Sequence, residues 1–228
     1  MGYKTNRSMP RPRREAAPRR TATPVLAQRA LAVDPSGRLP SVTRGTSTFH
    51  PLLYRKRIQS CEFARPGDLV VVYGPGDAQA GYGLYNSRSE IAVRVLFPGG
   101  DLPGEEHWRQ KLSVAVSLRR EMLNLDETSD AYRLIHAEAD GLSGLVVDRY
   151  GDVLSAEVFS LGMYQRAEAI LALLAPLCGT RHTIVRASPQ FLSQEGYDPS
   201  PFSSPDLPEQ VTVHEYGTRF RVRFAGGH

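Results

Sequence analysis

Basic, amide and aromatic side chains gather where short apolar runs of the sequence begin and end. Arginine and lysine can neutralise phosphate, and the face of a tyrosine can stack on an unpaired base, so this combination is typical of an RNA-binding surface. A charged turn beside a β-strand has the same composition, and the pattern alone does not separate the two. The candidate RNA-binding residues are Arg55, Lys56, Arg57, Tyr85, Asn86, Arg88 and Arg94.

No group of residues in the sequence indicates catalysis by itself. The glycines never form a Gly-x-Gly-x-x-Gly motif, so the sequence predicts no dinucleotide or S-adenosylmethionine loop, and we interpret the glycines as turn residues. The six histidines are scattered singly, without the spacing of a metal site. Three carboxylates, Glu138, Asp140 and Asp148, could do acid–base chemistry, but we favour their interpretation as turn caps or partners of nearby arginines.

The cysteines and the hydropathy of the chain indicate its compartment. Cys61 and Cys178 lie far apart without metal-ligand spacing, which is typical of a protein in a reducing compartment. No stretch approaches the roughly 20 consecutive apolar residues that a membrane-spanning helix needs. We therefore expect a soluble, cytoplasmic protein without a membrane partner.

The positive charge of the chain is concentrated at its start. The formal net charge is +4 and the pI is about 9.2, which suggests an anionic partner. Residues 1–20 hold seven basic residues and one acidic residue, whereas the other 208 residues hold 21 basic and 23 acidic residues, a net charge of −2. An RNA-binding surface on the folded part must therefore be a local patch.

Residues 1–48 are rich in Pro, Arg, Ala, Ser and Thr and follow neither the helical nor the strand period. Such a segment buries too little apolar surface to offset the entropy of ordering, so the sequence predicts a disordered basic arm over 1–48. Its arginines could contact phosphate weakly. We favour a solvated tail, or a translation start at Met9 instead of Met1, as the explanation of this composition.

The remaining residues predict a β-rich part, a helix and a mixed part. Several short strands separated by turn residues predict a small β-barrel over 49–98. Helical spacing follows over 104–125, inside a linking segment 99–126, and its apolar stripe consists of Trp108, Leu112, Ala115, Val116 and Met122. Residues 127–228 predict a small α/β domain, with hairpins over 145–159 and 211–224, a helix over 164–177, a strand over 183–187 and a loop over 197–208.

Four segments resemble the bacterial methyltransferases that make 5-methylcytosine in large-subunit ribosomal RNA, a family of S-adenosylmethionine-dependent enzymes. The segments occur in the family's order and together cover residues 49–228, so the resemblance is specific. They are HPLLYRKRI at 50–58, GLYNSRSEIAVRVL at 83–96, YRLIHAEADGLSGLVVDRY at 132–150, and EYGTRF at 215–220 with the closing Gly226-Gly227-His228.

The resemblance implies the nature of each part. Residues 49–98 should be a PUA domain, which is an RNA-binding β-barrel, and residues 127–228 should be the family's central α/β domain, truncated before the S-adenosylmethionine-binding domain. In the family, Lys-Thr-Gly and Asp-Gln-Arg elements, the cofactor-binding glycines, an Asp-Pro-Pro motif and a cysteine nucleophile follow the Gly-Gly-His segment. None of these elements occurs in this sequence, and neither Cys61 nor Cys178 has the matching context. We therefore expect no S-adenosylmethionine site in this chain, although the full-length family member uses that cofactor.

The resulting expectation is the RNA-binding portion of a ribosomal RNA cytosine-C5 methyltransferase, inactive alone, with ribosomal RNA as its partner and a homodimer formed through the catalytic domain. One alternative is a free-standing PUA-type RNA-binding protein in ribosome assembly or regulation, and another is a decayed remnant. A catalytic polypeptide encoded downstream or supplied in trans favours the enzyme. Salt-sensitive RNA binding without such a partner favours the free-standing module.

Overall fold

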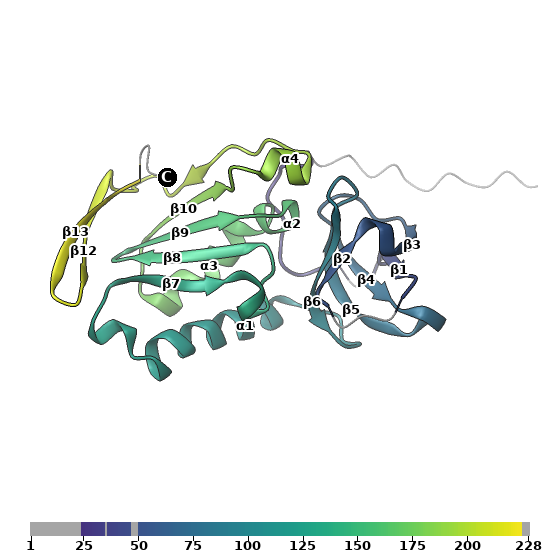
Figure 1. Cartoon of the computed structure of the whole chain (residues 1–228), viewed down its shortest axis with the longest axis horizontal. Helices are drawn as coiled ribbons and strands as arrows, with labels where there is room; N and C mark the ends of the chain where they lie inside the picture. The colour runs from purple at the N-terminus through teal and green to yellow at the C-terminus, as the bar shows by residue number, and fades with distance from the viewer. Residues whose placement is uncertain (1–23, 35, 47–49, 225–228) are drawn as a thin grey trace, which may run out of the picture.

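The computed structural model describes residues 24–34, 36–46 and 50–224 of the chain. These residues form a mixed α/β structure with three β-sheets arranged along its long axis (Figure 1). A curled six-stranded sheet lies at one end, a five-stranded sheet with helices occupies the middle, and a two-stranded ribbon lies at the other end.

The curled sheet is built around one strand that is buried on both faces. In β4, Val70 and Val72 pack inside the curl while Leu69 and Val71 belong to the main core, which is why the strand is apolar at successive positions instead of alternating. The order of strands is β2 (Leu52–Tyr54), β6 (Ile91–Pro98), β5 (Gln79–Tyr85), β4 (Leu69–Tyr73), β1 (Ser41–Arg44) and β3 (Ile58–Glu62).

Two glycines of β5 bring it close to β6 and help to curl the sheet. A Cβ atom on Gly81 would lie 2.4 Å from the carbonyl oxygen of Phe97, and one on Gly83 would lie 2.6 Å from that of Arg94. The register also shifts between Tyr82 and Gly83, as at a β-bulge. In the described part of the chain no ladder joins β2 to β3, so the barrel predicted from the sequence is observed as a curled sheet that is open along one side.

The prediction of a disordered arm is wrong for the described residues from Pro24 onward. Ser41–Arg44 is strand β1, paired with both β3 and β4, and Leu31 is buried in the main core. The Nε2 atom of Gln28 donates to the carbonyl oxygen of Tyr164 at 2.8 Å. This segment lacks periodicity because it is an extended strap whose apolar residues contact a surface formed by distant elements. Residues 1–23 lie outside the described residues.

The second sheet carries its helices on one face. Strands β7, β8 and β9 are antiparallel, β10 runs parallel to β9, and α1 and α3 contact each other and the sheet. The strand order is β11 (Phe202–Ser203), β10 (His182–Ala187), β9 (Val153–Val158), β8 (Leu145–Tyr150) and β7 (Ala131–His136). The helices are α1 (Glu105–Ser117), α2 (Leu161–Tyr164), α3 (Ala167–Cys178) and α4 (Phe191–Glu195).

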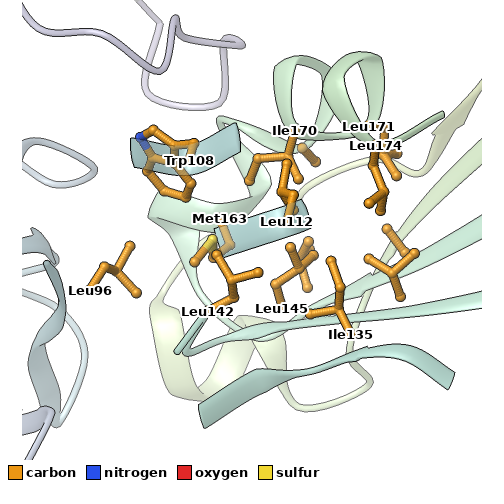
Figure 2. Close-up of a cluster of buried hydrophobic side chains, with 14 of the residues drawn as sticks. Leu96, Trp108, Leu112, Ile135, Leu142, Leu145, Met163, Ile170, Leu171 and Leu174 are labelled. Carbon is orange, nitrogen blue, oxygen red and sulfur yellow. The ribbon is translucent and has the colours of Figure 1, made fainter. Parts of the chain in front are cut away.

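One hydrophobic core joins the two sheets (Figure 2). Trp108 of α1 is fully buried and meets the ring of Phe97 from β6 edge-on, with 5.1 Å between the ring centroids. The side chains of Leu112 on α1 and of Ile170 and Leu174 on α3 continue this core over the second sheet. The predicted linking segment therefore packs as an integral part of both halves.

The apolar stripe of α1 ends earlier than the sequence predicts. Trp108, Leu112 and Val116 are buried, but the side chain of Met122 is 73% exposed. The helix changes to a π-helical turn over Leu118–Met122, where the amide of Leu123 donates to the carbonyl oxygen of Leu118. The additional residue per turn rotates Met122 away from the core.

Candidate RNA-binding surface

The turn between β2 and β3 presents three consecutive basic side chains to solvent. Arg55, Lys56 and Arg57 form a single 3-10 turn in which no residue is buried. The guanidinium of Arg55 pairs with the carboxylate of Glu90, while the side chains of Lys56 and Arg57 form no hydrogen bond or ion pair with a described residue. Two cations and the half-exposed ring of Tyr54 are therefore available to an anionic partner at this turn. We call residues 54–57 the basic turn.

Tyr85, one of the predicted RNA-binding residues, is buried instead. Its ring packs inside the curled sheet, and its hydroxyl oxygen accepts a hydrogen bond from the Cys61 thiol at 3.5 Å. Burial, followed by the contact with Cys61, raises the pKa of the Tyr85 hydroxyl to about 12. The ring cannot stack on a base while it fills this core.

Asn86 connects the two halves of the structure. Its Nδ2 atom donates to the carbonyl oxygen of Glu195 at 3.0 Å and to the Oε2 atom of the same residue at 2.8 Å. That carboxylate also accepts a hydrogen bond from the backbone amide of Leu161 at 3.0 Å. Both Asn86 and Glu195 are buried, so Asn86 fixes α4 against the curled sheet.

Two predicted arginines lie in the same interface. Arg94 is buried, donates to the Oγ atom of Ser143 at 3.2 Å and lies 3.6 Å from the Oε1 atom of Glu138. Burial lowers the pKa of the Arg94 guanidinium, and the nearby Glu195 and Glu138 carboxylates partly oppose this effect. The guanidinium of Arg88 donates to the carbonyl oxygen of Gly196 at 2.9 Å and lies over the ring of Tyr197.

The structure therefore separates the seven predicted residues into three groups. Arg55, Lys56 and Arg57 remain on the surface, and Arg88 is also exposed although it contacts Gly196 and Tyr197. Asn86 and Arg94 are buried between the two halves, whereas Tyr85 is buried inside the curled sheet. One signal for Arg94 was present in the sequence, because apolar residues surround it on both sides over 91–97. No comparable local signal exists for Asn86, whose partner lies 109 positions away.

Arg166, which was not among the predicted residues, is the most deeply buried cation of this interface. Its Nη1 atom donates to the carbonyl oxygens of Gly67 at 2.9 Å and Gly162 at 3.1 Å. Burial, followed by the nearby Arg29 cation, lowers the pKa of Arg166 to about 10, and the Asp68 carboxylate partly opposes this shift. Arg166 therefore joins α2 to the turn that precedes β4.

The candidate acid–base carboxylates are partners of arginines. The guanidinium of Arg119 contacts both oxygens of Asp140, at 2.6 and 2.9 Å, and Arg133 contacts both oxygens of Asp148, at 2.9 and 3.2 Å. This is the pairing that the sequence favours over a catalytic role. The Oε1 atom of Glu138 accepts a hydrogen bond from Ser143 at 2.7 Å, which places it in the Arg94 contact.

The two cysteines have different surroundings. Cys178 is buried at the end of α3, and burial raises the pKa of its thiol to about 11, so the thiol stays protonated at neutral pH. Cys61 is exposed on β3 and its sulfur is hydrogen-bonded to Tyr85. Among residues 24–34, 36–46 and 50–224, no three His, Cys, Asp or Glu side chains come close enough together to hold a metal ion.

The connections that follow the strands of the second sheet differ from a common S-adenosylmethionine site. Such a site commonly uses a glycine-rich loop between a strand and a long helix. Here β9 leads into α2, which has four residues, and β10 leads into α4, which has five, and neither connection is rich in glycine. A hollow of about 560 Å³ between α1 and the end of α3 is lined by polar and aliphatic residues, without an aromatic ring to stack on adenine.

No helix within the described ranges is long and apolar enough to cross a membrane.

One part of the chain matches a known family, and most of the chain aligns with curated relatives. Residues 40–97, which include β1, match the family described as PUA-like domain. The chain is 28% identical over 184 residues to a ribosomal RNA large subunit methyltransferase I of Photobacterium profundum, covering 78% of this chain and 46% of the relative. It is 27% identical over 187 residues to a ribosomal RNA large subunit methyltransferase of Deinococcus radiodurans, again covering 78% and 46%. The chain thus spans about half the length of the curated relatives it matches.

Solved structures show the same fold. A putative SAM-dependent methyltransferase from Streptococcus mutans aligns with a TM-score of 0.61 and 15% sequence identity, covering 80% of this chain and 48% of that one. A second putative methyltransferase, SMU.776, was solved in complex with SAH and aligns with a TM-score of 0.59 over 76% of this chain and 43% of that one. Residues 40–97 are therefore a PUA-like domain, in a chain that is homologous to ribosomal RNA large subunit methyltransferases.

Proposed function

We propose that this chain supplies the RNA-binding part of a ribosomal RNA cytosine-C5 methyltransferase and that its basic turn contacts the RNA backbone. The observation that carries the proposal is the exposed turn Arg55–Arg57 on a PUA-like domain, with two side chains that have no partner among the described residues. The names of the relatives support ribosomal RNA as the partner. The resemblance of the four sequence segments supports cytosine as the target.

The shared core holds the RNA-binding part in a fixed orientation. Trp108, Asn86 and Arg166 fix the curled sheet against the second sheet by packing and by buried hydrogen bonds. An RNA held at the basic turn is consequently held in a fixed orientation relative to the second sheet. Such fixed positioning is what a methyltransferase requires to present one nucleotide to its reaction centre.

Methyl transfer itself needs more than the described residues. The cofactor of the proposed enzyme donates a methyl group, and the described residues do not fit it. We therefore place the cofactor site and the cysteine nucleophile outside the described residues. The PUA-like match begins at residue 40, earlier than the predicted start at 49, and we place the linking and central parts at 99–126 and 127–228. Location in the cytoplasm and a homodimer formed through the catalytic part belong to the same proposal.

Removal of the basic turn should weaken RNA binding. In R55A/K56A/R57A, the affinity for a labelled fragment of large-subunit ribosomal RNA should fall about tenfold at moderate salt, at about 0.5 kcal/mol for each cation. The slope of log K against log salt concentration should become shallower by about 2. Fluorescence anisotropy over a series of KCl concentrations measures both quantities.

A matched control removes the same charge elsewhere. Arg38, Arg109 and Arg181 are exposed and pair with Glu62, Glu105 and Asp152, so R38A/R109A/R181A loses three positive charges without touching the basic turn. Its affinity should stay within about twofold of the unmodified chain, since these cations are already neutralised locally. Equal losses in the two triple variants would refute a specific role for the basic turn.

A methylation assay tests the division of labour. The 228-residue chain, incubated with ribosomal RNA and radiolabelled S-adenosylmethionine, should bind the RNA but transfer no methyl group, and calorimetry should detect no binding of the cofactor. Incorporation of label at cytosine C5 by this chain alone would contradict the proposal, because it would require a cofactor site within these residues.

A free-standing RNA-binding protein is the second candidate, because the described residues offer cations to RNA but do not fit the cofactor. The mass of the intact protein isolated from its own cells distinguishes the two functions. A mass well above 25.2 kDa supports the methyltransferase, and a mass of 25.2 kDa, or slightly less for a start at Met9, supports the free-standing protein.

A further inference from the structure

The two-stranded ribbon at the end opposite the PUA-like domain carries a row of arginines. Strands β12 (Gln210–Glu215) and β13 (Thr218–Arg223) are joined by Tyr216 and Gly217, whose φ angles of 46° and 79° fit the two-residue turn that suits a twisted hairpin. Side chains alternate between the faces of a strand, so Arg219, Arg221 and Arg223 share one face. Across β12, their partners are His214, Thr212 and Gln210.

The opposite face of the ribbon is the one that packs against the protein. Val213 is buried, and Val211 and Val222 contact a small cluster formed by Val153, Ile184 and Phe224. Glu215 is the acidic residue of the two strands. It lies on the same face as Val211 and Val213, because alternate residues of a strand share a face. The arginine face is therefore directed to solvent, and neither strand contributes an acidic side chain to it. Acidic residues lie near both of its ends, because Asp130 contacts His214 and Arg223 lines a hollow that also contains Asp148 and Glu157.

The three arginines are exposed and unpaired. None of Arg219, Arg221 and Arg223 forms a hydrogen bond or ion pair with another residue in the described part of the chain, whereas arginines 38, 55, 109, 133 and 181 each pair with a carboxylate. Alternate residues of a strand lie about 6.8 Å apart, so the row offers three regularly spaced cations. A ligand with regularly spaced negative charges complements such a row.

The ribbon is held in place at its turn. The backbone amide of His214 donates to the Oδ1 atom of Asp130 at 2.6 Å, and the amide of Tyr216 donates to the carbonyl oxygen of Thr128 at 2.8 Å. These bonds fix the main chain of the turn while leaving the ring of Tyr216 77% exposed. An exposed aromatic ring beside a row of cations is the combination that binds unpaired nucleotides, through stacking and phosphate contacts.

We propose that this arginine face, together with Tyr216, is a second RNA-binding surface, at which Arg219, Arg221 and Arg223 contact consecutive phosphates and Tyr216 stacks on an unpaired base. The surface lies at the opposite end of the molecule from the basic turn, so an RNA that contacts both must extend along the second sheet (Figure 1). This proposal and the proposed function both assign RNA as the partner, but this proposal depends on a separate set of residues.

The test compares three triple variants for binding to a labelled RNA hairpin with a single-stranded loop. R219A/R221A/R223A should lose at least tenfold in affinity, and its salt slope should become shallower by about 2. The control R38A/R109A/R181A, which has the same net charge, should stay within about twofold. R219K/R221K/R223K keeps the three positive charges and should retain affinity within about threefold, which would show that charge at these positions carries the affinity.

The tyrosine is tested separately. Y216A should lose about fivefold or more for the loop-containing RNA and should bind a fully paired duplex as the unmodified chain does, because only unpaired bases can stack on the ring. Circular dichroism and thermal unfolding of each variant verify that the ribbon remains folded.

The outcomes for the two RNA surfaces are separable. If R219A/R221A/R223A binds RNA no more weakly than the control triple variant, the ribbon face is not an RNA-binding surface and the inference is wrong. The same result is expected if the face binds an acidic protein surface instead. The basic turn would still stand if R55A/K56A/R57A loses affinity. If the ribbon variant loses affinity and the basic-turn variant does not, the inference holds and the assignment of the basic turn fails.

Discussion

Replacement of Trp108 by alanine should lower the free energy of unfolding by about 3–5 kcal/mol. The indole is fully buried in α1 and packs edge-on against Phe97 of the curled sheet, so its removal leaves a cavity where the two halves share their core. Urea unfolding measured by circular dichroism determines the loss. Tryptophan fluorescence cannot be used, since Trp108 is the only tryptophan of the chain.

Two further variants serve as controls for this measurement. Val114 lies on the exposed side of the same helix, and V114A should change the free energy of unfolding by no more than about 0.5 kcal/mol. The Nε1 atom of Trp108 has no hydrogen-bond partner among the described residues, so W108F loses volume but no hydrogen bond and should cost clearly less than W108A. If W108A and V114A cost the same, the indole does not connect the two halves.

Replacement of Arg119 by methionine should cost about 3–5 kcal/mol, because it removes one partner of a buried ion pair. The guanidinium contacts both oxygens of Asp140, and the two side chains are only 11% and 7% exposed. In R119M the carboxylate keeps its hydrogen bond from the amide of His136 but loses the compensating charge. Urea unfolding at neutral pH measures this loss.

The control for this pair lies on the same helix. Arg109 pairs with Glu105 at the surface, and R109M should cost less than about 1 kcal/mol. The double variant R119M/D140N removes the uncompensated charge and keeps an acceptor for the His136 amide, so it should recover more than half of the loss. A double variant as unstable as R119M would mean that packing of the arginine stem, and not the buried charge, explains the effect.

The buried residues indicate which substitutions should affect stability and which should affect RNA binding. Tyr85, Asn86 and Arg94 have side chains that suit RNA, yet each is buried and bonded within the chain. Asn86 and Arg94 keep the PUA-like domain in a fixed orientation on the second sheet, whereas Tyr85 stabilises the interior of the curled sheet. Substitutions at these positions should therefore act through stability, whereas substitutions in the basic turn or the ribbon should act through RNA affinity and its dependence on salt.

The sequence by itself determined the local elements. The continuous apolar run of β4, the stripe from Trp108 to Val116 and the alternating strands joined at Tyr216-Gly217 each follow from a period or a turn preference that acts over a few residues. These three features depend on neighbours in the sequence. The residue types also predict that Asp140 and Asp148 pair with arginines, but their partners Arg119 and Arg133 lie 21 and 15 positions away, so the tertiary structure selects them.

Only the tertiary structure decided where the polar side chains point and how the start of the chain packs. Asn86 contacts Glu195 across 109 positions, Arg94 contacts Ser143 across 49, and Gln28 contacts Tyr164 across 136. An arginine on a strand looks the same in sequence whether it meets a phosphate or a buried carboxylate, because the difference lies in which distant surface packs against it. The local pattern fixes the element, and the long-range packing decides which of its side chains remain available to RNA.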